Sequence, residues 1–251
     1  MDDTPSQKRP ILYRFMPAKW ALKSIETREL RVGRLAELND PFEFVPGIEE
    51  EDLPPAAPRD VIRHQMWKVK EDFNPMMGVL SFSSTPEEPT LWSHYAESHK
   101  GIALGFDFPP NVLGPAKVTY PPSSKSKRAI LYPGTRDPTA LEVCFRKTII
   151  TKASGWKAES EYRIVIDLIK SDCRLEQGDY FLPITDSNCI LVEVILGCRC
   201  TIGDSYVDQL LERHGFEGAR LLLAKPSIST FELEFSPSKV KKPTGPPKPI
   251  V

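Results

Sequence analysis

Residues 91–108 read LWSHYAESHKGIALGFDF, and this stretch changes character halfway along. Its first half is aromatic and follows Pro89, which predicts a short helix over residues 89–98. Its second half is an almost continuous apolar run that begins at Gly101, which predicts a buried strand over residues 101–108. The fold class then depends on the order of the elements on either side of this pair.

Strands and helices occur in mixed order on both sides of the central pair. Further strands are predicted over 11–16, 30–35, 78–83, 161–168, 179–184, 189–196, 219–224 and 230–235, and further helices over 17–28, 60–73, 137–150 and 204–214. This order predicts an α+β single domain over residues 11–235, with a mixed, bent or split β-sheet flanked by helices, rather than a doubly wound fold. No Gly-rich phosphate loop or dinucleotide fingerprint follows any predicted strand.

The composition indicates a protein of the cytoplasm. Lys and Arg number 33 against 34 Asp and Glu in 251 residues, so no global field favours nucleic acid or an anionic membrane. Five Cys do not make a disulfide framework. No signal peptide is expected, because residues 1–10 have no apolar core. No membrane span is expected either, because the apolar run 189–198 is too short to cross a bilayer. Residues 1–10 and the Pro/Lys-rich residues 236–251 are predicted to be disordered tails.

The aromatic helix carries the densest set of binding groups. Trp92 and Tyr95 are three residues apart and share a helical face, while His94, His99 and Lys100 follow closely. One interpretation is a core helix with an amphipathic rim. The other is a surface on which a base or nicotinamide ring stacks while the histidines and the lysine meet phosphate or ribose oxygens.

Two further pairs of polar residues lie at strand ends. Ser81 and Ser83 point to one face of a strand, where they could hold a polar substrate or simply cap the next turn. Glu159 and Glu161 precede a later strand, where they form either a solvated loop end or a carboxylate pair in one site. In such a pair the charge of one carboxylate is expected to raise the pKa of the other.

Arg14 lies inside the first predicted strand, among apolar neighbours. A guanidinium in such company needs a partner, which is either a carboxylate in a structural ion pair or the phosphates of a ligand. The cysteines and histidines show no metal-ligand spacing, so no metal site is predicted.

Six segments resemble a bacterial family known only as a domain of unknown function. They are LYRF at 12–15, LNDPFEF at 38–44, LSFSS at 80–84, LWSHYAESHKGIALGFDF at 91–108, WKAESEYRIV at 156–165 and VEVILG at 192–197. They occur in the family's order and extend over residues 11 to 235. The resemblance implies one domain but brings no activity with it.

A looser resemblance carries chemistry. The order of Arg14, then Ser81 and Ser83, then Glu159 and Glu161 is similar to the arginine–serine–glutamate group of ADP-ribosyltransferases, which bind NAD in the cleft of a split sheet. It implies that NAD is the substrate and that Arg14 clamps its pyrophosphate. Ser81 and Ser83 would organise the site, Glu161 would accept from a ribose hydroxyl and stabilise the cation, and Glu159 would act as general base.

The same resemblance implies that the loop from Asn39 to Glu43 forms one wall of the NAD site, and that Trp92 or Tyr95 stacks on nicotinamide. The acceptor of ADP-ribose is a protein or a nucleic acid that the sequence does not identify, and a toxin or phage-defence effector is one setting for such an enzyme. Two alternatives stay open. One is an effector that binds or modifies nucleic acid through the basic loop 121–128 and the basic tail, and the other is a non-enzymatic module that binds a ligand or a partner.

Overall fold

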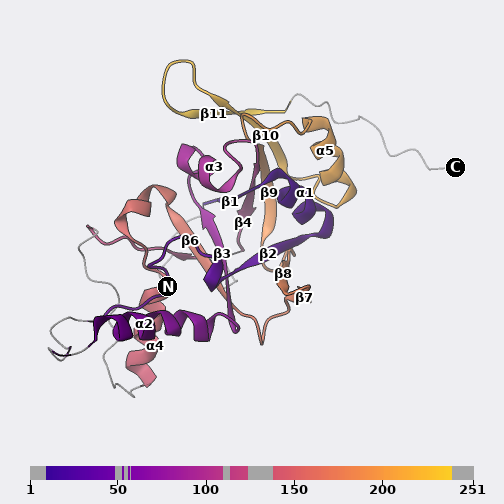
Figure 1. Ribbon diagram of the computed structural model, residues 1–251. Coiled ribbons are helices and arrows are strands. Elements are labelled where there is room, and N and C mark those ends of the chain that lie inside the picture. Colours follow the sequence, from indigo (N-terminus) through magenta and orange to yellow (C-terminus); the bar gives the residue numbers. More distant parts are fainter. Residues whose placement is uncertain are drawn as a thin grey trace, which may run out of the picture.

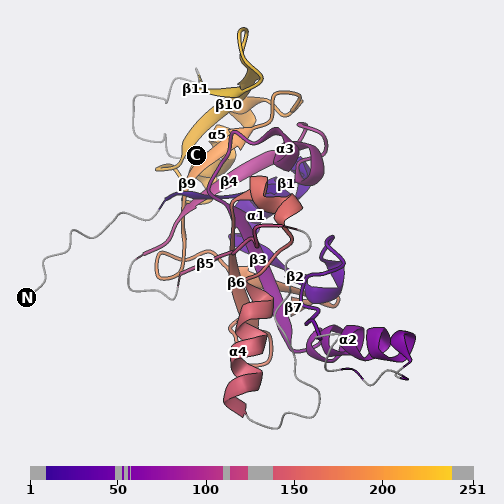
Figure 2. The same cartoon turned by 90° about the vertical axis from the view of Figure 1, so that its left-hand side faces the viewer.

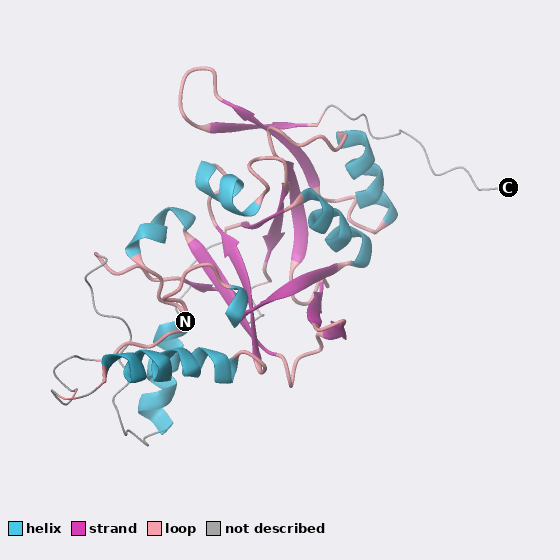
Figure 3. Cartoon of the chain, in the orientation of Figure 1, coloured by secondary structure: helices cyan, strands magenta, loops and turns pink. Residues whose placement is uncertain are grey.

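The computed structural model describes residues 10–48, 53, 56, 58–109, 114–123 and 138–238. These residues form one α+β domain, in which helices lie around a mixed sheet (Figure 3). The helices are α1 (Ala18–Thr27), α2 (Arg59–Phe73), α3 (Pro89–Tyr95), α4 (Pro138–Ile149) and α5 (Asp204–Arg213). The strands are β1 (Leu12–Met16), β2 (Glu29–Arg34), β3 (Met77–Ser83), β4 (Ile102–Asp107), β5 (Ala116–Lys117), β6 (Glu161–Asp167), β7 (Arg174–Glu176), β8 (Asp179–Pro183), β9 (Ile190–Leu196), β10 (Arg220–Pro226) and β11 (Leu233–Pro237).

The strands follow the order β11-β10-β9-β4-β1-β3-β2-β8-β7, with β6 and β5 joined through β3 (Figure 1). Among the strands of the described residues, β9 and β10 are the one parallel pair, and α5 connects them. The other pairings are antiparallel, so the sheet is mixed as the sequence predicts.

Alternation along the strands gives the central sheet two buried faces. Leu12 and Met16 of β1 belong to the large core that α1 and α5 cover, together with Ile25 of α1 and Leu211 of α5. Tyr13 of β1 points the other way and packs in a smaller core beneath α3. The period of two in β1 therefore separates the two layers, and α3 lies on the opposite face from α1 and α5.

The sheet opens between β1 and β2, because both pair with the same edge of β3 but at opposite ends of it. Tyr13 of β1 is opposite Ser83, whereas Gly33 of β2 is opposite Val79. The other edge of β3 is paired with β6 along the whole strand. Residues 80–82 of β3 therefore face a wedge-shaped opening, and the pairings of the described chain place no strand against them on this edge.

Helices α2 and α4 lie at the end of the molecule away from β10 and β11, in both views (Figures 1 and 2). They pack on a third small core that includes Leu35, Phe44 and Ile149. Within it, the ring of Phe73 of α2 contacts that of Phe145 of α4, with 4.7 Å between the ring centroids. This end carries the chain that leads into the candidate site.

The sequence misses two strands and misplaces one domain boundary. Strand β5 has two residues and β7 is fully exposed, so neither has a hydrophobic period to find. Residues 236 and 237 belong to β11, and the Ser238 hydroxyl donates to Asp204 at 2.7 Å, so the predicted tail boundary at 236 is wrong. Residues 1–9 and 239–251 lie outside the described residues, as does most of the basic loop 121–128. Within the described residues, no helix has both the length and the apolar character needed to cross a membrane.

Candidate functional site

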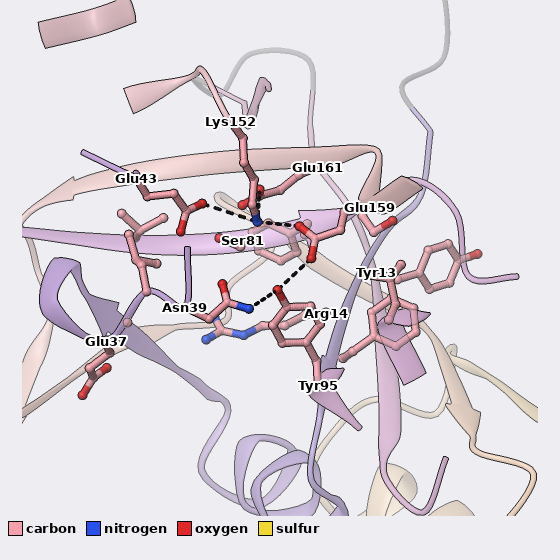
Figure 4. Close-up of a pocket in the computed structure, with 17 residues that line it drawn as sticks. Tyr13, Arg14, Glu37, Asn39, Glu43, Ser81, Tyr95, Lys152, Glu159 and Glu161 are labelled. Carbon is pink, nitrogen blue, oxygen red and sulfur yellow. Dashed lines mark hydrogen bonds and ion pairs between the residues drawn. The ribbon is translucent and has the colours of Figure 1, made fainter. Parts of the chain in front are cut away.

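A cavity of about 220 Å³ occupies the opening between β1 and β2 (Figure 4). Seven of the residues predicted from the sequence line it, although they are spread along the chain from β1 to β6: Arg14, Asn39, Ser81, Ser83, Tyr95, Glu159 and Glu161. The fold therefore brings the predicted arginine, serines and glutamates to one place.

Local backbone geometry directs both glutamates into the cavity. Glu159 ends the 3₁₀ turn η3 (Ser154–Glu159), and Glu161 begins β6. Ser160 between them adopts the left-handed conformation with φ 44°, which reverses the chain direction within one residue. A left-handed non-glycine residue costs about 1–2 kcal/mol, and here it leaves both carboxylates buried on the same side.

The ammonium group of Lys152 joins three carboxylates. Its Nζ lies 2.5 Å from Glu159 Oε2, 3.2 Å from Glu161 Oε2 and 3.4 Å from Glu43 Oε1. The lysine and the three glutamates are all buried, so water screens these charges poorly. The carboxylate pair is thus an interior ionic cluster and not a solvated loop end.

Arg163 completes this cluster from the core side. Its Nε donates to Glu161 Oε1 at 2.7 Å and its Nη2 donates to Glu161 Oε2 at 2.8 Å, a bidentate geometry that fixes the carboxylate. The same Nη2 also donates to Glu43, whose other oxygen is buried without a partner. With three carboxylates and two cations ionised, the cluster carries one net negative charge.

A short chain of hydrogen bonds holds the remaining oxygen of Glu159. The Tyr95 hydroxyl donates to Glu159 Oε1 at 2.7 Å and accepts from Asn39 Nδ2 at 2.9 Å (Figure 4). Burial, followed by the nearby Glu159 charge, raises the pKa of Tyr95, so the phenol keeps its proton. Tyr95 therefore contributes a donor to the site, where the sequence predicts a stacking ring.

Two carboxyl groups of the cluster have pKa values shifted in opposite directions. Burial alone would raise the pKa of Glu161, but the charges of Arg163 and Lys152, with hydrogen bonds from Arg163 and Ser81, outweigh it and hold that pKa below its usual value. Burial raises the pKa of Glu43, and its two cationic neighbours do not fully compensate. The carboxyl with a raised pKa is therefore Glu43, which lies outside the predicted pair, and the expectation that Glu159 raises the pKa of Glu161 is wrong.

The hydrogen bonds also distinguish the two predicted catalytic glutamates. A carboxylate has about four acceptor positions. Those of Glu161 are taken by two bonds from Arg163, by Lys152 and by Ser81. Within the described residues Glu159 has two hydrogen-bond partners, Tyr95 and Lys152, and so keeps open acceptor positions. In this structure Glu159 can accept further hydrogen bonds, whereas the acceptor positions of Glu161 are taken.

Arg14 has no carboxylate partner in the described chain. Its Nη2 donates to the carbonyl oxygen of Arg31 at 2.7 Å across the opening, and its Nη1 is buried without any partner. Burial, followed by the charge of Arg31, lowers the pKa of Arg14 to about 10, so the guanidinium is still charged at neutral pH. The sequence predicts either a carboxylate or an anionic ligand as the partner of Arg14. The described residues place no carboxylate on it, and an anionic ligand would pair with its guanidinium.

Four residues predicted to bind the cofactor do not line this cavity. Trp92 is fully buried and its Nε1 donates to the Pro86 carbonyl oxygen at 2.8 Å, so its ring belongs to the core and has no free face for a ligand. His99 stacks on Trp92 in a tight turn at φ 70°. His94 and Lys100 are exposed outside the cavity lining. The core-helix interpretation therefore holds for this part of the motif, with Tyr95 as the exception.

The remaining small residues serve the backbone. The Ser83 hydroxyl accepts from the Thr85 amide at 3.1 Å, so Ser83 caps the next turn while Ser81 contacts Glu161. A Cβ on Gly101 would lie 2.3 Å from the Met16 carbonyl oxygen, so this glycine allows a close approach of backbone and not of a ligand.

Sequence reasoning missed Lys152 and gave Glu43 no chemical role. Lys152 follows α4 without any local motif, and its backbone amide donates to the Thr119 carbonyl oxygen at 3.1 Å, a contact between distant segments that no sequence pattern predicts. Glu43 lies in the LNDPFEF segment, so its motif gave a signal, but a single acidic residue in a loop does not predict burial.

No group of three or more His, Cys, Asp or Glu residues in the described ranges could hold a metal ion. In comparisons with known proteins, no family model, curated protein or solved structure matches the chain. Function is therefore argued from the geometry of the cavity.

Proposed function

We propose that the cavity binds NAD and that the protein is an ADP-ribosyltransferase-like enzyme that cleaves the bond between nicotinamide and ribose. The observation that carries this proposal is the charged guanidinium of Arg14, whose Nη1 is buried without a partner, in the same cavity as the buried pair Glu159 and Glu161. The resemblance in the order of arginine, serine and glutamate supports the same chemistry.

The charges of the cavity are complementary to the two charged groups on either side of the nicotinamide ribose of NAD. The pyridinium ring of NAD is a cation and its pyrophosphate is an anion. Glu159 and Glu161 bring two carboxylates to the lining of the first cavity, which favours the pyridinium and the cation that develops on the ribose. The Nη1 group of Arg14 has no partner in the described chain and can donate to a phosphate oxygen.

The reaction breaks the glycosidic bond between the nicotinamide nitrogen and C1′ of the ribose. The electron pair of that bond leaves with neutral nicotinamide, and an oxocarbenium-like cation develops on the ribose, as in glycoside hydrolysis. Water or an acceptor nucleophile then donates an electron pair to C1′ and loses one proton. Neither oxidant nor reductant takes part.

The two glutamates divide this work. Glu161, fixed by Arg163 and Ser81 and with its pKa lowered, supplies a permanent negative charge near the developing cation. Glu159 keeps open acceptor positions and takes the proton of the attacking nucleophile. This assignment keeps the general base where the sequence places it, but makes Glu161 act through charge and not through a hydrogen bond to the ribose.

The test is nicotinamide release from NAD, measured with and without cell extract as a source of acceptors, for the wild type and Glu159→Gln. We expect the wild type to release nicotinamide, and the variant to lose labelling of the acceptor more than it loses simple NAD hydrolysis. Glu71→Gln, an exposed change on α2, is the matched control. Absence of nicotinamide release by the wild type under both conditions would contradict the proposal and leave a non-enzymatic binding module.

A further inference from the structure

A second cavity, of about 320 Å³, lies next to the first one and shares Arg14 and Phe15 with it. Residues of α1 form one wall, including Trp20, Ser24 and Thr27, and Phe181 of β8 lies on another. The first cavity alone is smaller than the range of about 300–1,000 Å³ that is usual for ligand sites, whereas the two together fall within that range. Arg14 stands at the boundary between them.

The two cavities differ in the balance of charged side chains that line them. The first is lined by four carboxylates, those of Glu37, Glu43, Glu159 and Glu161, and by two cations, Arg14 and Lys152. The second is lined by three cations, Arg14, Lys23 and Arg31, and by two carboxylates, Glu29 and Asp179. Both of those carboxylates are paired, Glu29 with Arg174 and Asp179 with Arg31, and Arg31 is also paired with Glu37 of the first cavity. An elongated ligand with a cationic end and an anionic middle therefore has one preferred direction across Arg14.

We propose that the second cavity binds the adenosine monophosphate half of the dinucleotide, with the pyrophosphate on Arg14 and the nicotinamide half in the first cavity. This inference rests on the proposed function, because it names the part of the same substrate that the first cavity has no room for. Nothing in the sequence motifs points to this wall, since α1 carries none of the residues that the resemblance matches.

The residues of the second cavity suit an aromatic base with a phosphorylated sugar. Trp20 lines this cavity with a large ring that is 46 % exposed and can pack against an aromatic base. Ser24 and Thr27 bring hydroxyl groups of α1 to the same wall. Lys23 adds a second cation to this cavity, beside the Nη1 group of Arg14, which is buried without a partner. Stacking and phosphate contacts then act on the half of the ligand that does not react.

The experiment compares NAD with nicotinamide mononucleotide, which has the scissile bond but lacks the adenosine monophosphate half. The readout is the ratio of kcat/KM for the two substrates, and in parallel the dissociation constant of AMP. Thr27→Trp fills the second cavity from the end of α1, and Glu26→Trp places the same ring on the exposed side of the same helix as the matched control.

We expect Thr27→Trp to lower the preference for NAD over the mononucleotide, and to weaken AMP binding, each by about tenfold or more, because base stacking and phosphate contacts are lost. Glu26→Trp should keep the wild-type values. If Thr27→Trp does not fold, Trp20→Ala replaces it, with the exposed Trp67→Ala on α2 as its control.

The possible failures are distinguishable. If the wild type cleaves neither substrate, the proposed function fails, while AMP binding still tests the second cavity. If NAD is cleaved and the variants keep the wild-type preference and AMP affinity, the proposed function survives and the adenosine site is wrong. AMP binding that is equal in Thr27→Trp and the wild type overturns the inference in either case.

Discussion

Replacement of Lys152 by methionine tests whether the buried ionic cluster is real. Methionine has a similar length and removes only the ammonium group, which lies within 3.4 Å of oxygens of Glu43, Glu159 and Glu161. Removal of one partner from a buried ion pair typically costs about 3–5 kcal/mol, because charge is left buried without compensation. At about 2–4 °C per kcal/mol for a chain of this size, the expected decrease in Tm at pH 7 is about 6–20 °C.

The pH dependence gives this prediction its sign. Lys152 is one of the charges that lower the pKa of Glu43 and Glu161, so both pKa values rise in the variant. Burial already raises the pKa of Glu43 in the folded state. A group with a raised folded-state pKa contributes stability at pH values below its unfolded-state pKa. That contribution is lost as pH rises through the folded-state pKa. The pKa of Glu161 is lowered in the wild type, so its contribution is present above the unfolded-state pKa and is lost only in acid.

The difference in Tm between the wild type and Lys152→Met should therefore increase from pH 5 to pH 7. The assay is thermal unfolding followed by circular dichroism at pH 5, 6 and 7, with Lys157→Met, an exposed lysine of η3, as the control. A decrease in Tm no larger than that of the control, or a difference that does not change with pH, would refute the buried cluster.

Three further predictions concern Arg14, Tyr95 and the C-terminal segment. Arg14→Met should weaken NAD binding at least tenfold by calorimetry while leaving Tm unchanged or higher, because it removes a buried charge that has no counter-ion; a large decrease in Tm with unchanged affinity would contradict the ligand role. Tyr95→Phe removes the donor to Glu159 and should cost about 1 kcal/mol, or about 2–4 °C in Tm, with a loss of acceptor labelling; wild-type labelling would exclude a role for this hydroxyl. Deletion of residues 239–251 should leave Tm within about 1 °C, because this Pro/Lys segment has little apolar surface to bury, and a larger decrease would show that it docks on the domain.

The elements with a strong hydrophobic period could be predicted from the sequence. Strands β1, β3, β4 and β9 and helices α1 and α5 lie close to their expected positions, because each strand is a mostly apolar run and each helix repeats its apolar residues on one face. The period cannot reveal β5 and β7, which have two and three residues with exposed side chains. Strand order and register depend on contacts across the whole chain, so the opening between β1 and β2 appears only in the structure.

The residues of the candidate site could likewise be predicted only where the sequence carries a local pattern. Arg14 and the pair Glu159 and Glu161 could be found because polar groups stand out beside apolar strands. The sequence offers Trp92 as a ligand-binding residue, because the spacing of aromatic residues on a helix is the same for a core face and for a binding face. In the structure Trp92 is buried in the core. Lys152 has no signal of its own, since its role arises only from the charges that the fold places around it.

The most direct measurement is the rate of nicotinamide release from NAD by the wild type and by Glu161→Gln, with folding of both checked by thermal melts. Glutamine keeps the size of the side chain but removes the negative charge that offsets the cation on the ribose. Loss of such a fixed charge typically costs about a hundredfold or more in kcat, so we predict that decrease, with Glu161→Asp retaining more activity than Glu161→Gln. Wild-type turnover by a folded Glu161→Gln protein would contradict the account.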